Sequence, residues 1–178
     1  CYEKIAEFAK PDVYILDAGC GVTFFPFFLN QRYTVTCVDQ DDYVSMFKAI
    51  NEKQNTKVDF IRSSLNSLPF PDNSFDVLYC ISVLEHTDNY NKILDEFKRV
   101  LKPGGLLVVT FDIALNKNDW GLDIPAARAL IQQVSGLFEL SYSIHDFDRD
   151  MSEKSRYSTA YAEKYMAKEL MPWPPLTL

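Results

Sequence analysis

Two acidic residues and two glycines near the start of the chain have the spacing of a nucleoside-binding site. Asp17 closes an apolar run, Gly19 and Gly21 follow at once, and Asp39 lies 20 positions after Gly19. Glycines let a ligand approach the backbone closely. An acidic residue about 20 positions after the first glycine is typical of a side chain that binds the hydroxyls of a ribose. The pattern therefore predicts a ligand that contains a ribose.

Two classes of ribose-containing ligand fit this pattern. A dinucleotide-binding loop has a third glycine where this chain has Phe24. The carboxylate of Asp17 would also repel a pyrophosphate, whereas it suits a ligand with a positive end. A nicotinamide-dependent oxidoreductase therefore remains only a less favoured alternative.

Five blocks of sequence, taken in order, resemble the class I methyltransferases that use S-adenosylmethionine. More narrowly, they are similar to the type 11 subgroup, which acts on small molecules. The blocks are Leu-Asp-Ala-Gly-Cys-Gly at 16–21, Val-Asp at 38–39, Leu-Pro-Phe-Pro-Asp-Asn-Ser-Phe-Asp at 68–76, Val-Leu-Glu-His at 83–86 and Leu-Lys-Pro-Gly-Gly at 101–105. The resemblance covers roughly residues 13–115. It implies S-adenosylmethionine as the cofactor and methyl transfer to an oxygen or nitrogen of a small polar molecule.

The resemblance also implies roles for individual residues. Asp17 would lie near the methionine part of the cofactor, and Asp39 would bind the ribose. Ser64 stands where the family commonly has an acidic residue that bonds the adenine amine, so adenine binding is expected to be weaker. The remaining candidates for cofactor binding are Gly19, Cys20, Gly21, Thr23, Phe24, Gln40, Leu65, Ile81 and Ser82.

Each assignment has a purely structural alternative. The two glycines could serve only a strand-to-helix turn. Asp17 could be a buried strand-end carboxylate that accepts hydrogen bonds from backbone N–H groups. Asp39 could cap the turn that follows it. Thr23 replaces a glycine that the family often has, and together with Ser64 it keeps open a non-catalytic scaffold subunit.

His86 and Asp112 are the candidate catalytic residues. The methyl donor is already activated, so the protein mainly supplies alignment and desolvation, and a base is needed only if the acceptor must lose a proton. His86 could be that base, although the Leu-Glu-His block is shared by methyltransferases with different acceptors, which favours a structural role. Asp112 could orient a polar acceptor or be a solvated carboxylate. Some metal-dependent relatives have a carboxylate where this chain has Ser82, so no metal site is predicted.

The positions of these residues depend on an alternation of strands and helices. This alternation predicts a Rossmann-like, doubly wound α/β fold with a mostly parallel sheet and helices on both faces. The expected strands are 13–17, 34–38, 57–61, 75–81, 105–111 and 138–144, and the expected helices are 22–30, 42–53, 89–101, 125–135 and 157–170. Between them, 62–74 is expected to be a loop along the ligand edge, and Gly136 is expected to end a helix. The acceptor pocket is expected to come from 82–90, 112–122 and 145–170.

Composition limits the class of protein. A chain of 178 residues, 47% of them hydrophobic, is enough for one methyltransferase domain, with a cofactor-binding core at 13–115 and a substrate-side segment at 116–178. The family's seventh, antiparallel strand is not evident, and the chain starts with Cys1, so we expect a fragment or a processed chain.

The charge and the cysteines bear on partners and location. A net charge of −7 without a dense basic cluster argues against a nucleic-acid partner. No apolar run reaches the roughly 20 residues of a membrane span. Four cysteines without paired spacing indicate a reducing compartment, so a cytoplasmic protein is expected. The partner is then a small-molecule acceptor, and the sequence does not predict an oligomeric state.

Overall fold

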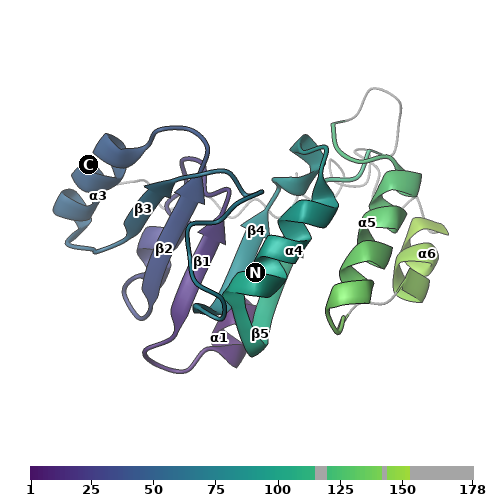
Figure 1. Cartoon of the computed structure of the whole chain (residues 1–178), viewed down its shortest axis with the longest axis horizontal. Helices are drawn as coiled ribbons and strands as arrows, with labels where there is room; N and C mark the ends of the chain where they lie inside the picture. The colour runs from purple at the N-terminus through teal and green to yellow at the C-terminus, as the bar shows by residue number, and fades with distance from the viewer. Residues whose placement is uncertain (115–119, 142–143, 153–178) are drawn as a thin grey trace, which may run out of the picture. The chain divides into compact units, whose positions relative to one another are not determined.

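A computed structural model of the chain describes residues 1–114, 120–141 and 144–152 (Figure 1). Contacts between residues divide the chain into two compact units. The first consists of residues 1–112 with 136–138, and it contains all the residues of the glycine loop and of the sheet. The second consists of residues 113–135 and 139–178.

The first unit is built on a five-stranded parallel sheet in the order β3-β2-β1-β4-β5. The strands are β1 (Tyr14–Ala18), β2 (Thr34–Asp39), β3 (Asp59–Arg62), β4 (Phe75–Ile81) and β5 (Leu101–Thr110). Because all neighbouring pairs are parallel, the carboxyl ends of the strands lie at one edge of the sheet. The chain order reverses beside β1, where β2 lies on one side and β4 on the other. In doubly wound sheets, ligands bind at such a point.

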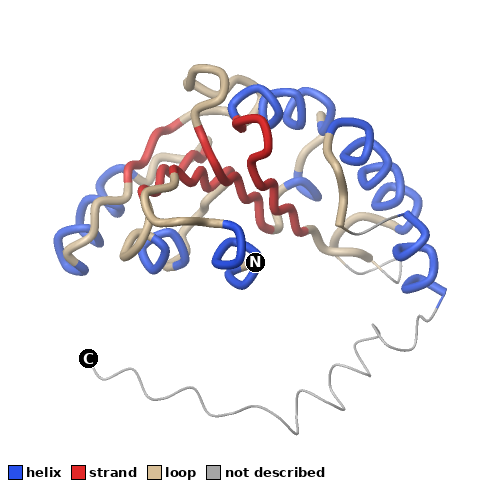
Figure 2. The backbone as a smooth tube through the Cα atoms, turned by 90° about the horizontal axis from the view of Figure 1, so that it is seen from below, coloured by secondary structure: helices blue, strands red, loops and turns tan. Residues whose placement is uncertain are grey.

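Helices cover both faces of this sheet (Figure 2). One face carries α1 (Tyr2–Phe8), α2 (Phe25–Leu29) and α3 (Val44–Gln54), and the other carries α4 (Tyr90–Val100). On the first face, Ile5, Phe27 and Phe47 pack in one core cluster with strand residues such as Ile15 and Val77. The predicted α/β fold is therefore confirmed. Helix α1 was not predicted.

Two details of the first unit differ from the sequence prediction. Helix α2 begins at Phe25 rather than at 22, with Pro26 in its first turn, where a residue without an N–H group is best tolerated. The strand expected at 105–111 begins at Leu101, so β5 includes the Lys102–Gly105 segment. This segment interrupts the pairing of β4 with β5. The register of the pair shifts there, because Phe75 pairs with Leu101 but Val77 pairs with Leu106. Gly104 accommodates this irregularity with a φ of +75°.

The second unit contains α6 (Ile144–Ser152) and most of α5 (Ile124–Leu137). Helix α5 buries the four residues predicted as its inner face, which are Ala127, Leu130, Ile131 and Val134. Arg128 of α5 forms two hydrogen bonds with Asp148 of α6, at 3.0 and 3.1 Å. None of the helices in the described ranges is long and apolar enough to cross a membrane.

Two predictions for this region are wrong, and a third falls outside the described residues. Gly136 does not end α5, which continues to Leu137. The strand expected at 138–144 is not found in the described part of that range, because 138–141 are irregular and Ile144 begins α6. The predicted helix at 157–170 lies outside the described ranges. No seventh strand occurs in the part of the chain that the structure describes.

Candidate functional site

The glycine loop follows β1 and is tied to the end of β2. The N–H groups of Gly19 and Cys20 both donate to the carbonyl oxygen of Val38, at 2.8 and 3.1 Å. Gly19 has a φ of +81°, and a Cβ on this residue would lie 2.7 Å from Cγ2 of Val83. Cys20 is buried, so its backbone rather than its thiol is presented at this loop. The loop therefore requires glycine at position 19 for its backbone conformation and for its close packing.

Substitution of Gly19 by alanine is expected to lower the free energy of unfolding by about 2 kcal/mol, because a side chain would have to adopt a left-handed conformation and displace Val83. Chemical denaturation would measure this loss. Gly136→Ala is a matched control, since Gly136 lies within α5 and a Cβ added there would meet no other atom within 4 Å. It should raise stability by about 0.5–1 kcal/mol. Equal effects of the two substitutions would contradict the role of Gly19.

Gly21 and Asp39 form the centre of the candidate site. The N–H group of Gly21 donates to Oδ2 of Asp39 at 2.9 Å, and the N–H group of Asp41 donates to Oδ1 at 3.0 Å. A Cβ on Gly21 would meet no atom within 4 Å, so open space lies beside the loop at this glycine. Asp39 thus caps the turn that follows it, in agreement with the structural alternative. Each carboxylate oxygen has two lone pairs and so keeps capacity for a further donor.

Asp17 is a buried carboxylic acid at the end of β1. It is 3% exposed and lies beside Cys37 of β2 and Tyr79 of β4 in the sheet register. Its Oδ2 accepts a hydrogen bond from the hydroxyl of Tyr79 at 2.8 Å and is 4.0 Å from Sγ of Cys37. Burial raises its pKa to about 7, with a smaller contribution from the charge of Asp39, against the lowering effect of the Tyr79 hydroxyl.

The polar partner of Asp17 differs from the one that the sequence suggested. The structural alternative expected backbone N–H groups, but the short contact is made by the hydroxyl of Tyr79, which is itself buried. Burial also raises the pKa of Tyr79 and of Cys37, so both remain protonated near neutral pH. A carboxyl group with a pKa near 7 in such a place would be ionised more readily when a cation lies nearby.

The loop after β3 borders the same edge of the sheet. The N–H group of Ser63 donates to the carbonyl oxygen of Asp39 at 2.9 Å, and Nε of Arg62 donates to the carbonyl oxygen of Gln40 at 2.8 Å. Ser64 is exposed, and its hydroxyl oxygen accepts the N–H group of Asn66 at 3.2 Å. Gln40 directly follows Asp39 in the chain, and Ser64 directly follows Ser63, which is hydrogen-bonded to Asp39. Leu65 follows Ser64 in this loop and is half-buried.

Four further candidates lie on segments next to β1. Thr23 and Phe24 are exposed between the glycine loop and α2, and 70% of Phe24 is accessible to solvent. Ile81 ends β4 and is 37% exposed. Ser82 follows with a φ of +51°, which is uncommon for a residue other than glycine, and its N–H group donates to the carbonyl oxygen of Thr110 at 3.0 Å.

The two candidate catalytic residues follow β4 and β5. His86 belongs to a short 3-10 helix, Leu84–His86, and is exposed. Asp112 is also exposed, and its backbone N–H group donates to Oε1 of Glu85 at 3.0 Å. Glu85 therefore links the segment after β4 to the end of β5. The side chains of His86 and Asp112 remain available to a ligand, but no hydrogen bond or ion pair between described residues joins them.

The sequence prediction missed three residues that shape this site. Tyr79 is the hydrogen-bond partner of Asp17, and Arg99 and Glu96 hold the loop after β3. Tyr79 lies 62 positions from Asp17, so only the pairing of β1 with β4 brings them together. The sequence pattern places Arg99 and Glu96 on the solvated face of their helix and gives no signal of a loop that covers them.

Comparison with known proteins gives a family match for the part of the chain that carries this site. Residues 16–109 match the profile of a methyltransferase domain family. An uncharacterized protein of Methanocaldococcus jannaschii is 33% identical over 79% of this chain and 55% of its own length. A sterol 24-C-methyltransferase of Gibberella zeae is 36% identical over 56% of this chain and 28% of its own length. A phosphoethanolamine N-methyltransferase of Arabidopsis thaliana is 30% identical over 57% of this chain and 21% of its own length.

A solved structure supports the same relationship. The crystal structure of a methyltransferase from Methanosarcina mazei has a TM-score of 0.56 and 27% identity, and the similarity covers 65% of this chain and 59% of that one. Its description names S-adenosylmethionine as the molecule on which that enzyme depends. Among the relatives, the chain spans about half the length of the first and less than a third of the other two.

Proposed function

This chain belongs to the class I methyltransferases that use S-adenosylmethionine, and from that premise we propose that it transfers the methyl group to an oxygen or nitrogen of a small polar molecule. The observation that supports this most is the arrangement of Asp39 beside Gly21, with the buried acid Asp17 at the end of the adjacent strand. Asp39 would accept hydrogen bonds from the ribose hydroxyls. Asp17 would face the methionine part of the cofactor, which carries the positive sulfonium and ammonium groups.

The residues present fit this cofactor. Open space beside Gly21 leaves room for a ligand at the loop. Each carboxylate oxygen of Asp39 accepts one backbone N–H group and can accept a further hydrogen bond from a ligand. S-adenosylmethionine, when bound, supplies a methyl group that is already activated. The protein then has to orient the cofactor and the acceptor and to exclude water. The exposed imidazole of His86 would accept a proton from an acceptor that must lose one.

The choice of a polar acceptor rests on the side chains next to the strand ends. Ser82, His86 and Asp112 are all polar and not buried, which suits an acceptor that can form hydrogen bonds. The relatives are named for a sterol carbon and for the nitrogen of phosphoethanolamine, so related domains methylate different atoms. The net charge of −7 supports a small molecule rather than a nucleic acid as the acceptor.

The proposal is tested first by cofactor binding and then by turnover. S-adenosylmethionine at about 100 times its dissociation constant should stabilise the folded protein by about 2.7 kcal/mol, whereas NAD should not. Tritium-labelled S-adenosylmethionine would then be offered with amine, phenol and sugar acceptors, and transfer of label to one of these classes is the expected result. Stabilisation by NAD alone would instead support an oxidoreductase.

A non-catalytic scaffold is the second candidate, and one contact favours it. The hydroxyl oxygen of Ser64 already accepts the N–H group of Asn66, and serine carries no charge with which to hold the adenine amine. Weak cofactor binding would follow from this arrangement. Calorimetry that detects no binding at millimolar S-adenosylmethionine would identify the scaffold, whereas binding followed by methyl transfer would exclude it.

A further inference from the structure

The loop between β3 and β4 has no helix of its own, yet it carries two of the cofactor candidates. Ser64 and Leu65 belong to its first half, and residues 68–74 form its second half. A loop without regular backbone hydrogen bonds needs other contacts to hold one conformation. In this protein many of those contacts come from one arginine near the end of α4.

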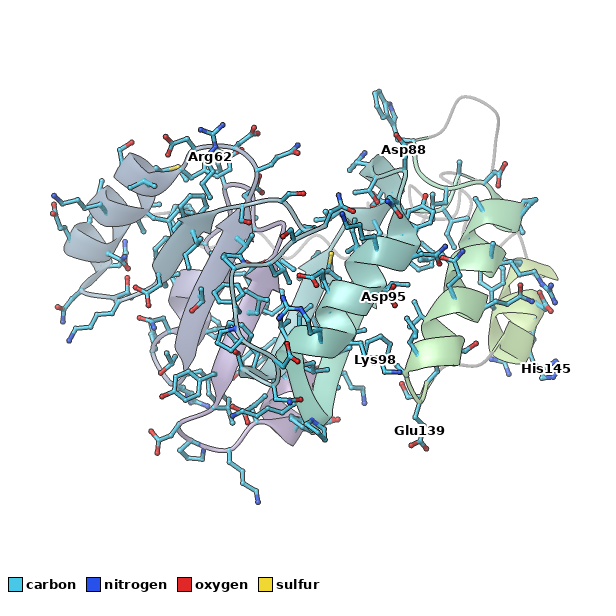
Figure 3. All side chains as sticks on the ribbon, viewed as in Figure 1. Arg62, Asp88, Asp95, Lys98, Glu139 and His145 are labelled. Atoms are coloured by element: carbon cyan, nitrogen blue, oxygen red, sulfur yellow. The ribbon has the colours of Figure 1, made fainter. Side chains whose placement is uncertain are left out.

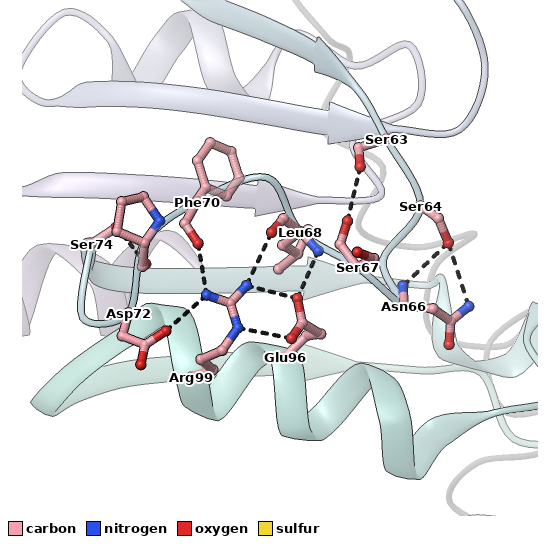
Figure 4. Close-up of polar contacts among 11 residues, drawn as sticks. Ser63, Ser64, Asn66, Ser67, Leu68, Phe70, Asp72, Ser74, Glu96 and Arg99 are labelled. Atoms are coloured by element: carbon pink, nitrogen blue, oxygen red, sulfur yellow. Dashed lines mark hydrogen bonds and ion pairs between the residues drawn. The ribbon is translucent and has the colours of Figure 1, made fainter.

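Arg99 makes five hydrogen bonds in this region (Figure 4). Two of them go to carbonyl oxygens of the loop, those of Leu68 at 3.0 Å and Phe70 at 2.7 Å. One goes to Oδ1 of Asp72 at 3.0 Å. The remaining two go to the two carboxylate oxygens of Glu96, both at 2.8 Å.

Glu96 completes this contact from the same helix. Its Oε2 also accepts the backbone N–H group of Leu68 at 2.7 Å. The side chains of Arg99 and Glu96 are 30% and 18% exposed, so water competes only in part for these bonds. The hydrogen bond from Arg99 holds the pKa of Glu96 below its usual range, although burial acts in the other direction. Leu68 is thus held through both its N–H and its carbonyl group.

A series of hydrogen bonds continues from Leu68 toward Asp39. The carbonyl oxygen of Ser67, the residue before Leu68, accepts the hydroxyl of Ser63 at 3.1 Å, and the N–H group of Ser67 donates to the carbonyl oxygen of Ser64 at 3.1 Å. The N–H group of Ser63 then donates to the carbonyl oxygen of Asp39 at 2.9 Å. The turn with Ser64 and Leu65 is therefore held between Asp39 at one end and Arg99 with Glu96 at the other.

We propose that Arg99, together with Glu96, is a positioning residue that sets the adenine-binding conformation of the turn at 63–67. This inference rests on the proposed function, since it needs S-adenosylmethionine to be the cofactor. Arg99 acts through Leu68 and the serine turn and touches no cofactor atom itself. Because Ser64 carries no charge, selectivity for adenine depends on how accurately the turn places its polar groups.

The test measures selectivity for the base as well as affinity. S-adenosylhomocysteine and its deaminated analogue S-inosylhomocysteine differ only at one edge of the base, where a carbonyl oxygen replaces the adenine amine and N1 gains a hydrogen. The wild-type protein should prefer the adenine compound, and in Arg99→Gln the ratio of the two dissociation constants should fall about tenfold. A general loss of folded protein would weaken both compounds equally and leave the ratio unchanged.

Two further variants and one control make the test specific. Arg99→Lys keeps the charge but has three donors, so it should restore the ratio only in part. Glu96→Gln leaves one carboxamide oxygen in place of two carboxylate oxygens and should lower the ratio even if Arg99→Gln does not fold. Lys98→Gln removes the same charge from an exposed neighbouring position, labelled in Figure 3, and should leave the ratio unchanged.

Hydrogen exchange gives an independent measurement. The amide of Leu68 should exchange about tenfold faster in Arg99→Gln, whereas the amide of Val77 in the centre of β4 should not change. An unchanged selectivity ratio in folded Arg99→Gln and Glu96→Gln would overturn the inference, as would a wild-type protein that binds both compounds equally. If the wild-type protein binds neither compound, the proposed function fails as well, so the two failures are distinguishable.

Discussion

Replacement of Asp39 by alanine is expected to weaken the binding of S-adenosylmethionine about a hundredfold. Asp39 would hold two ribose hydroxyls with an ionised carboxylate, and hydrogen bonds to a charged group contribute about 1.5 kcal/mol each. The loss of two such bonds corresponds to about 3 kcal/mol. Isothermal titration calorimetry of the folded variant would measure this effect.

The contacts of Asp39 within the protein require a matched control. Its carboxylate accepts the N–H groups of Gly21 and Asp41, so the substitution also loosens the glycine loop. Asp41→Ala removes the same charge two positions away, from an exposed side chain, and should weaken binding less than about threefold. Asp39→Asn keeps one acceptor oxygen, so its loss of affinity should lie between those of Asp39→Ala and Asp41→Ala. If Asp39→Ala and Asp41→Ala had equal effects, a general electrostatic attraction would replace the specific role of Asp39.

Most strands of the sheet could be predicted from the sequence because they contain short runs of apolar and β-branched residues. The run at 75–81 coincides with β4, and the run at 34–38 coincides with β2 apart from Asp39 at its end. Parallel strands buried on both faces are recognisable in this way. Alternation at 138–144 was misleading, since Ile144 begins a helix and a short alternating segment does not distinguish a strand from an irregular one.

The candidate site could be proposed from the sequence only where its residues are close in sequence or at strand ends. The spacing from Gly19 to Asp39 located the glycine loop and its acidic neighbour, and the structure brings Asp39 within 2.9 Å of the N–H group of Gly21. The role of Arg99 could not be predicted, because helical periodicity shows which face of a helix is apolar but not whether a distant loop covers the polar one. Its loop partners lie 27 to 31 positions away.

The stability of the protein is expected to decrease as the pH rises from 5 to 8, and the buried acid Asp17 is the cause. Its pKa is about 7 in the folded protein and about 3.8 in the unfolded chain. The folded state therefore binds a proton that the unfolded state has already released between these values. The stabilisation is fully present below pH 3.8 and is lost as the pH rises through 7. The loss between pH 5 and pH 8 amounts to about 3 kcal/mol.

Substitution of Asp17 by asparagine should remove most of this pH dependence. The asparagine side chain stays neutral, and its oxygen can still accept the hydroxyl of Tyr79. At pH 8 the variant should be more stable than the wild type by about 4 kcal/mol, because the whole difference between the two pKa values then counts. This is roughly 12 °C in the melting temperature of a domain of this size. The lowered pKa values of Asp76 and Glu96 act below about pH 4 and do not affect this range. Denaturant titrations at pH 5, 6.5 and 8 would measure the effect.

The exposed aspartate Asp95 of α4, labelled in Figure 3, is the control, and Asp95→Asn should leave the pH dependence unchanged. A pH profile of Asp17→Asn that is parallel to that of the wild type would show that Asp17 is already ionised at pH 5.

The same substitution should have the opposite effect on cofactor binding. An ionised carboxylate without a cationic partner is costly to bury, and a cationic ligand would offset this cost. S-adenosylmethionine should therefore bind the wild-type protein with release of a proton near pH 6.5, detectable as a dependence of the binding heat on the ionisation enthalpy of the buffer. In Asp17→Asn the released proton should disappear and the affinity should fall about tenfold. A variant that gained stability and kept its affinity would show that Asp17 serves the fold alone.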